Sequence, residues 1–141
     1  MVSSELTAPA EQSEIYSESV SSNVIVSWFS GYITPELADD RRVQFRPLLA
    51  RCSTPTWIME LTAMTGFDPR TVAAGAKWLR AFKESGGREI LFISAQSAAR
   101  AAVSGVALGM RIPVRFFDDL DECFKTLGII LPVRRSIPPL I

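Results

Sequence analysis

The sequence contains no histidine, and its only two cysteines, Cys52 and Cys123, lie far apart. Without histidine, the Ser–His and Cys–His nucleophile pairs of many hydrolases are excluded, and no G-x-S-x-G motif occurs. Zinc and iron–sulfur sites are disfavoured as well, because they are usually built from closely spaced Cys and His. A secreted disulfide framework is equally disfavoured. We therefore expect two buried, reduced thiols, no metal and no cofactor.

The sequence also lacks an excess of positive or negative charge. Lys plus Arg and Asp plus Glu each total 15, which gives a formal net charge of zero. A chain without net charge has no overall electrostatic attraction to nucleic acid or to an anionic membrane. No apolar run approaches the roughly 20 residues needed to cross a bilayer. The first residues, MVSSELTAPAEQSE, are polar and acidic where a signal peptide would be basic and then apolar. A cytoplasmic protein without nucleic-acid or membrane partners is expected.

Glycine-rich phosphate-binding motifs are missing too. Neither G-x-x-x-x-G-K-[ST] nor G-x-G-x-x-G occurs, so the backbone cradle typical of nucleotide-binding loops is lacking. Together with the missing nucleophile pairs, this predicts that the protein is not an enzyme.

What is present fits one globular domain. The chain has 141 residues, of which 48% are hydrophobic, enough for a single core. Residues 1–13 are rich in Ser, Glu, Ala and Thr without an apolar period, and we expect a mobile tail there. Residues 14–127 are predicted to form the domain. Residues 128–141, GIILPVRRSIPPLI, contain three prolines and no helical period. This tail is predicted to be either extended against the domain or free.

The stretch TWIMELTAMTGFDPRTVAAGAKWL, residues 56–79, is the centre of the predicted fold. Residues 57–61 are short and apolar and predict a buried strand. A Thr/Gly-rich corner follows. Asp68 as N-cap and Pro69 at the first helical position then predict the start of a helix. The residues predicted to point inward are Val72, Ala76, Leu79 and Phe82. Trp78 lies off this stripe. Like Trp28 and Trp57 it is expected to fill or rim the core, although an exposed indole there would mark a dimer or partner face.

The flanking segments alternate strand and helix. Residues 14–20 and 24–29 predict a hairpin, and Thr34 followed by Pro35 predicts a helix start. Pro47 predicts a kink or break near Phe45 in that helix. Its candidate inward residues are Leu37, Val43, and Leu48 or Leu49. Further strands are predicted at 89–93 and 112–117, with helices over 98–108 and from 118. The fold class is therefore α/β, a largely parallel sheet with an antiparallel first strand and helices packed on it.

Residues 14–124 resemble the STAS domain, the fold of the bacterial anti-sigma factor antagonists. Four pieces in the same order carry the resemblance: GYIT, IMELTAMTGFDPRTV, GG before EILFI, and RIPVRFFDDLDEC. The resemblance implies a protein-interaction adaptor or scaffold in bacterial signalling. Its implied partners are a regulatory kinase, an anti-sigma factor or a scaffold protein, with a homodimer as a further option.

The chain departs from that family at the phosphorylated position. The family's second helix usually begins with an Asp-Ser-Ser-Gly turn, whose serine is phosphorylated by the partner kinase. Here Glu60 matches the strand acid and Asp68 the turn aspartate, while Pro69 and Arg70 stand at the two serine positions. Arg70 cannot accept a phosphate, so control by the usual serine phosphorylation is not expected. Thr71 is the nearest hydroxyl and an alternative acceptor, although one step along a helix turns a side chain by about 100°.

The resemblance places the contact surface on the loop 62–66 and the first helical turn. Met64 and Phe67 are either apolar anchors of that surface or plugs of the core beneath it, and Arg70 is a candidate partner for a carboxylate or phosphate. The predicted partner-binding residues are Thr34, Thr62, Ala63, Met64, Thr65, Gly66, Asp68, Pro69, Arg70 and Thr71.

A second hypothesis places a small ligand at the carboxyl ends of the parallel strands. Thr65, Ser94 and Gln96 would line a site for a small anion or nucleotide, and the protein would be a sensor. A polar pocket there favours the sensor. A flat surface with Met64 and Arg70 exposed favours the adaptor.

Overall fold

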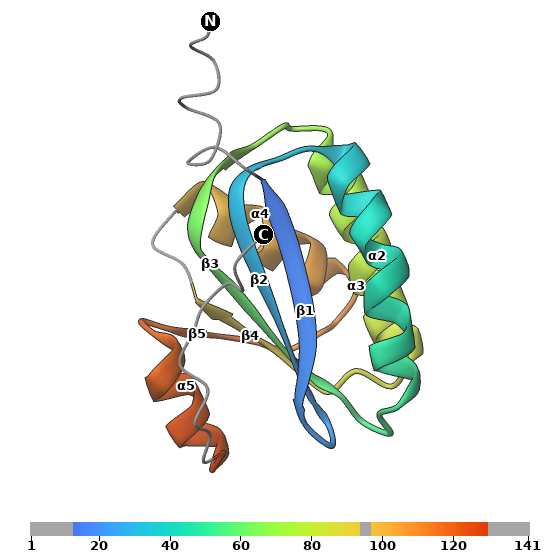
Figure 1. Cartoon of the computed structure of the whole chain (residues 1–141), viewed down its shortest axis with the longest axis vertical. Coiled ribbons are helices and arrows are strands. Elements are labelled where there is room, and N and C mark those ends of the chain that lie inside the picture. Colours follow the sequence, from blue (N-terminus) through green and yellow to red (C-terminus); the bar gives the residue numbers. More distant parts are fainter. Residues whose placement is uncertain (1–12, 94–96, 130–141) are drawn as a thin grey trace, which may run out of the picture.

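The computed structural model describes residues 13–93 and 97–129, which form one five-stranded sheet with helices on both faces (Figure 1). The order of the strands across the sheet is their order in the sequence. The first two strands are antiparallel, and each later neighbour is parallel to the one before it. The strands are β1 (Glu14–Ser21), β2 (Val24–Ile33), β3 (Thr56–Phe67), β4 (Glu89–Ile93) and β5 (Val114–Phe117). The predicted α/β fold with an antiparallel start is confirmed.

Three of the four helices in the described residues connect parallel strands and cover one face of the sheet. They are α2 (Pro35–Ala50), α3 (Thr71–Glu84) and α4 (Ser97–Gly109). Each connection adds its strand on the same side, so crossovers of one hand bring all three helices to one face. The last helix, α5 (Leu120–Leu127), follows β5 and packs on the opposite face. No helix in residues 13–93 and 97–129 is long and apolar enough to span a membrane.

The main core lies between the sheet and the three crossover helices. Its centre is a group of packed aromatic rings. The ring centroid of Phe45 in α2 lies 4.6 Å from that of Trp57 and 4.7 Å from that of Trp78. Trp78 is buried, and its Nε1 donates a hydrogen bond of 2.9 Å to the carbonyl of Ala38. Trp78 therefore fills the core, because α2 packs against the flank of α3 that carries it, and the alternative of an exposed indole is wrong. Val72, predicted to point inward, is instead 38% exposed.

Helix α2 begins at Pro35, as predicted, and the Thr34 hydroxyl caps it by accepting from the amide of Leu37 at 3.2 Å. The predicted break near Phe45 is wrong. The helix continues through Pro47 to Ala50, because Phe45 and Leu49 are both buried in the main core and hold the last turns in place. The predicted inward residue Val43 is 68% exposed.

The predicted starts of the last strand and the last helix were also wrong, and so was the predicted burial of one thiol. The last strand begins at Val114 rather than 112, and the helix after it begins at Leu120, capped by the Asp119 carboxylate. Cys52 is only half-buried, whereas Cys123 is fully buried, and both are free. Most of the predicted N-terminal tail (1–12 of 1–13) and most of the predicted C-terminal tail (130–141 of 128–141) lie outside the described residues.

The opposite face of the sheet has its own smaller core. Val26, Ile58 and Leu91 of three neighbouring strands are buried there together with Cys123 and Phe124 of α5. The strand register places side chains of this face in rows across the sheet. One row is Tyr16, Trp28, Glu60, Ile93 and Phe117.

Candidate functional site

The predicted corner 62–66 is part of β3 and not a loop. β3 pairs with β4 only over residues 56–60, and beyond this point it continues beside β2 alone to Phe67. The loop prediction is therefore wrong. Thr62, Thr65 and Phe67 are residue types that suit a strand, and pairing with β2 outweighs the turn tendency of Gly66.

Two irregularities in the β2–β3 pairing give this end of β3 its shape. The register shifts between Trp28 and Ser30 and again between Gly31 and Tyr32, each time with one extra residue on β3. Gly31 has a positive φ of 72°, which glycine adopts without strain. Because each extra residue resets the alternation of side chains, three residues spaced three apart all point to the helix-covered face. These are Leu61, Met64 and Phe67.

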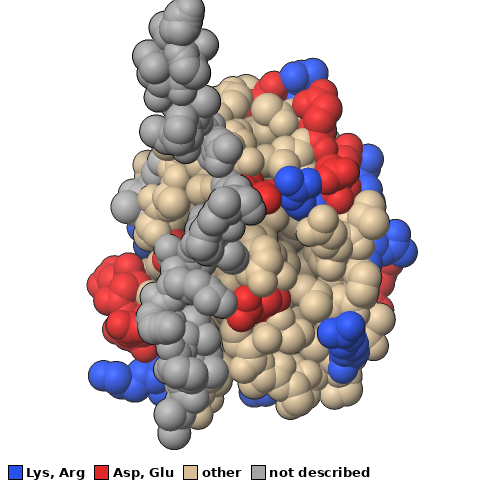
Figure 2. Space-filling view, in the orientation of Figure 1, with Lys and Arg blue, Asp and Glu red and all other residues tan. Residues whose placement is uncertain are grey.

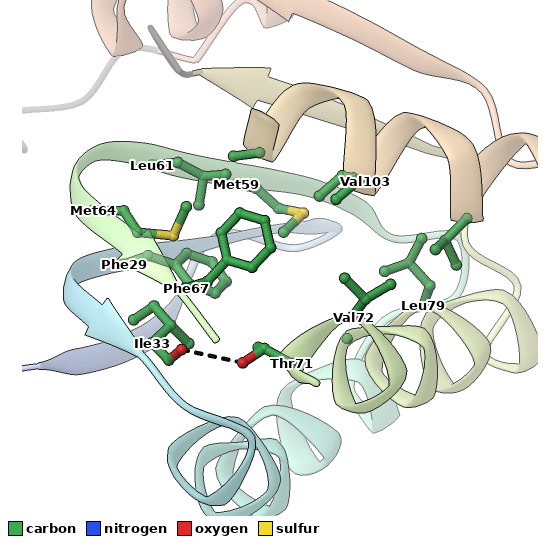
Figure 3. A pocket seen from close by; sticks show the side chains of 14 residues that line it. Phe29, Ile33, Met59, Leu61, Met64, Phe67, Thr71, Val72, Leu79 and Val103 are labelled. Carbon is green, nitrogen blue, oxygen red and sulfur yellow. Dashed lines mark hydrogen bonds between the residues drawn. The ribbon is translucent and has the colours of Figure 1, made fainter. Parts of the chain in front are cut away.

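A hollow opens between these side chains and the helices α3 and α4 (Figure 3). Its volume is about 90 Å³. Figure 3 shows Met64 and Phe67 from β3 facing Val72 and Leu79 from α3, with Val103 from α4 above. We call it the apolar pocket. It is lined by Phe29, Ile33, Met59, Leu61, Met64, Phe67, Thr71, Val72, Gly75, Leu79, Ala99, Ala102, Val103 and Val106.

The polar side chain in the pocket wall is already engaged. The Thr71 hydroxyl donates a hydrogen bond of 3.1 Å to the carbonyl of Ile33, which also accepts from the amide of Asp68 at 3.0 Å. These two bonds tie the start of α3 to the end of β2. A phosphate on Thr71 would have to break the first of them.

The turn before α3 differs from the prediction. α3 begins at Thr71, two residues after Pro69. The reason is that the Asp68 carboxylate accepts from the amide of Arg70 at 2.9 Å, forming a turn ahead of the helix instead of capping it.

Asp68 and Arg70 also form an ion pair. Arg70 Nη2 lies 2.6 Å from Asp68 Oδ2, and Nε lies 3.1 Å from Oδ1. The side-chain and backbone hydrogen bonds from Arg70 lower the pKa of the Asp68 carboxyl below its ordinary value. The same pair raises the pKa of Arg70. Arg70 nevertheless remains 72% exposed, so its positive charge is held in place and available to a partner.

The predicted contact residues fall into two groups. Met64 is 6% exposed, so its role as an exposed anchor is wrong: the register of β3 turns it into the pocket beside Phe67, which is half-buried. Thr34 serves as the cap of α2. The residues that lie exposed along the end of β3 and the following turn are Thr62, Ala63, Thr65, Pro69 and Arg70.

Next to this surface, Glu60 lies at the last β3 position that pairs with β4. It is 9% exposed, and its Oε1 accepts from the amide of Thr62 at 2.8 Å and from the Thr62 hydroxyl at 2.6 Å. These bonds fix the strand at the point where its pairing with β4 ends.

The predicted polar ligand site is not assembled in the described part of the chain. Thr65 is exposed on β3, while Ser94 and Gln96 lie outside the described residues. The hollow found near the strand ends is apolar rather than polar. Within residues 13–93 and 97–129, no three His, Cys, Asp or Glu side chains are placed to hold a metal ion.

Among known proteins, only solved structures match this chain. No family model and no curated protein matches the chain. An uncharacterised protein of the DUF3478 family from Shewanella loihica, with a SpoIIAA-like fold, has a TM-score of 0.64 at 15% identity over 83% of this chain and 96% of its own. The Bacillus cell fate determinant SpoIIAA, in its phosphorylated form, has a TM-score of 0.62 at 14% identity over 80% and 98%.

An anti-sigma factor antagonist from Mycobacterium paratuberculosis has a TM-score of 0.55 at 17% identity, over 86% of this chain and 97% of its own. The chain has the SpoIIAA-like fold. The resemblance to the STAS domain, which includes the SpoIIAA-like proteins, is thus confirmed at the level of fold.

Sequence reasoning missed the apolar pocket of this SpoIIAA-like domain. One signal was present, because small residues lie where α3 and α4 face the sheet. Gly75, Ala99 and Ala102 all line the hollow. The other wall could not be predicted, because the alignment of Leu61, Met64 and Phe67 depends on the two register shifts in β3.

Proposed function

We propose that this protein is a non-enzymatic, STAS-like protein-interaction module in bacterial signalling or regulation. Its contact surface is the exposed end of β3 and the turn before α3. We call this the β3–α3 surface, and it consists of Thr62, Ala63, Thr65, Pro69 and Arg70. The anti-sigma factor antagonists of the same fold make a protein partner the natural expectation.

The observation that carries the proposal is the fixed, exposed Arg70. Its guanidinium is held by two oxygens of Asp68, so it loses little side-chain freedom when a partner binds. Guanidinium groups recognise carboxylates through paired hydrogen bonds, and Arg is enriched at binding hot spots. The partner is therefore expected to present a carboxylate to this turn. Regulatory kinases, anti-sigma factors and scaffold proteins are the candidate classes.

Binding at this surface is proposed to be constitutive. Arg70 stands where the related pattern has its phosphorylated serine, and the Thr71 hydroxyl is bonded to the Ile33 carbonyl. Modification of Thr71 remains a prediction that mass spectrometry of the cellular protein can test.

The test is a charge reversal, Arg70→Glu, with a matched reversal on the same helix. Partners are captured from cells that express the tagged full chain, and each is then titrated in purified form. Arg70→Glu should weaken the main interaction at least about tenfold, as expected for loss of a charged contact plus new repulsion. Arg80→Glu, an exposed position ten residues along α3 and about 15 Å away, should leave it unchanged. Equal affinities for wild type and Arg70→Glu, with an intact fold by circular dichroism, would remove this surface from consideration.

The apolar pocket supports a second candidate function, in which the protein senses a small molecule. Its lining is almost wholly apolar, so the ligand would be an uncharged or largely hydrocarbon molecule rather than the anion or nucleotide first predicted.

Gly75→Leu would fill this pocket, because a side chain at that position meets nothing within 4 Å. Gly105→Leu is the matched control, since Gly105 is also helical and open but does not line the pocket. Titration with benzene, a small apolar probe, followed by NMR should show binding to wild type and Gly105→Leu but not to Gly75→Leu. Identical titrations for all three proteins would contradict the sensor.

A further inference from the structure

The topology leaves one face of the sheet with little cover from described elements. All three crossover helices lie on the other face, and α5 is the described helix that packs on this one. The charged groups near Cys123 of α5 are its neighbour Glu122 together with Glu89 of β4 and Arg115 of β5. The half of this face formed by β1 and β2 therefore extends beyond α5, as Figure 1 shows with α5 below the β4–β5 end. We call this half the β1–β2 face, and Figure 2 shows the molecule from the same direction.

The β1–β2 face is rich in apolar side chains, and Val26 and Trp28 on it are buried. Tyr16 stacks on Trp28 with ring centroids 5.9 Å apart, and Val20, Val24 and Val26 lie on the same side. A face of this kind is normally covered.

One polar group on this side lacks a hydrogen-bond partner, and two carboxylates lie near it. The Trp28 indole Nε1 is buried and has no hydrogen-bond partner in the described structure. A buried donor left without an acceptor is costly, so an acceptor from elsewhere is expected. Its register neighbour Glu60 is a buried carboxylate that forms no ion pair with any described residue. Glu18 on β1 adds a second acid, which accepts from the Tyr16 hydroxyl at 3.0 Å.

The end of the described chain points to the occupant. Gly128 has a φ of 72° and ends α5, with the amide of Ile129 donating to Phe124 O at 3.0 Å and that of Gly128 to Lys125 O at 3.1 Å. This paired arrangement closes the helix and reverses the chain. Ile129 itself packs into the smaller core. The described chain therefore ends on this same face.

The remaining segment, residues 130–141, has the composition and length to cover it. Its sequence is ILPVRRSIPPLI, with three prolines that cannot act as backbone donors and so need no sheet hydrogen bonds. Twelve residues in an extended form span about 37 Å at about 3.1 Å each. Crossing from β5 to β1 requires about 19 Å at about 4.8 Å per strand. Arg134 and Arg135 carry positive charge, the sign that pairs with the carboxylates of Glu18 and Glu60.

We propose that residues 130–141 dock on the β1–β2 face of their own domain. Leu131 and Val133 pack over Tyr16 and Trp28, a carbonyl of the segment accepts from the Trp28 indole, and the two arginines pair with Glu18 and Glu60. The segment thereby closes this side of the sheet and leaves the β3–α3 surface open to a partner. This inference does not depend on the proposed function.

The test measures hydrogen exchange of the three tryptophan indole N–H groups by NMR in the full chain. Trp57 donates to Ser27 Oγ at 2.9 Å and Trp78 to Ala38 O, so both are internal controls. The double change Leu131→Asp with Val133→Asp should speed exchange at Trp28 at least about tenfold while leaving Trp57 and Trp78 unchanged.

Charge variants separate the ionic part of the contact. Arg134→Glu with Arg135→Glu should also speed exchange at Trp28, whereas Arg134→Lys with Arg135→Lys, which keeps the charge, should change it much less. Exchange at Trp28 that is the same in wild type and in both acidic double variants overturns the proposal. Protection of Trp28 that disappears on tenfold dilution of the wild type also overturns it, because the cover would then be a second copy of the chain.

Discussion

At the scale of single residues, the two cysteines show how position decides chemistry. Cys123 is fully buried, and this burial raises the pKa of its thiol from 9.0 to about 12. The acids Glu89 and Glu122 act in the same direction, while Arg115 opposes them. Cys52 is half-buried, and burial raises its pKa too. Neither environment activates a thiolate, which agrees with a role in packing.

The first prediction concerns the pH dependence of stability. Between pH 9 and about 12 the unfolded chain loses the Cys123 proton while the folded chain keeps it. The unfolded state then binds fewer protons, so the free energy of unfolding should fall as the pH rises through this window. Urea denaturation of wild type and Cys123→Ala between pH 7 and 11 checks this.

The alkaline loss of stability should be smaller in Cys123→Ala and nearly unchanged in Cys52→Ala. Parallel pH curves for wild type and Cys123→Ala would contradict the assignment. The comparison of slopes is used because the cavity left by removing a buried sulfur lowers stability by a similar amount at every pH.

Individual residues are also where sequence reasoning failed most. The predicted stripe of α3 omitted Trp78, which is buried, and included Val72, which is exposed at the edge of the pocket. A helical period identifies residues on one side of a helix, but it does not say how wide the covered side is. The packing of α2 against α3 widens it to include Trp78, and this contact joins segments 40 residues apart.

At the scale of elements, starts were predicted better than ends. Thr34 and Pro35 predicted the start of α2, because a cap and a first-turn proline act locally. β3 was predicted to end at residue 61 and runs to Phe67, because its extension depends on pairing with β2, more than 30 residues earlier. The site lies mostly on that extension. The sequence could predict most residues of the candidate site. It could not predict the shape of the site, because that shape depends on the pairing of β3 with β2.

The second prediction concerns two glycines, Gly75 within α3 and Gly87 shortly after its end. A Cβ on Gly87 would overlap the ring of Phe82, which is fully buried and has no room to move. Gly87→Ala should therefore lower the free energy of unfolding by about 1–3 kcal/mol. Gly75→Ala should raise it by about 0.5–1 kcal/mol, since Gly75 lies within a helix and its Cβ would meet nothing.

Chemical denaturation of both variants beside wild type measures these differences. Because the substitution is the same in each, the opposite signs isolate the effect of local packing. Two changes of the same sign would show that Phe82 can move away or that the helix at Gly75 is less regular than described.

At the scale of the whole molecule, the fold class could be predicted because it depends on a repeated pattern rather than on any one contact. Strands 89–93 and 14–20, with the helices between them, are visible as apolar runs separated by turn residues. Alternation of strand and helix then leaves few topologies open. The pattern cannot show how the described helices divide between the two faces of the sheet, and the further inference concerns the face that carries only α5 among them.

The match between strand order in space and in sequence has a consequence for how the protein is made. The hairpin of β1 and β2 can form from adjacent residues as soon as they leave the ribosome. Every later strand joins the edge that its predecessor has just created, so no earlier pair has to open to admit it. Synthesis therefore proceeds in the same direction as assembly, and the unfinished sheet exposes one growing edge at a time.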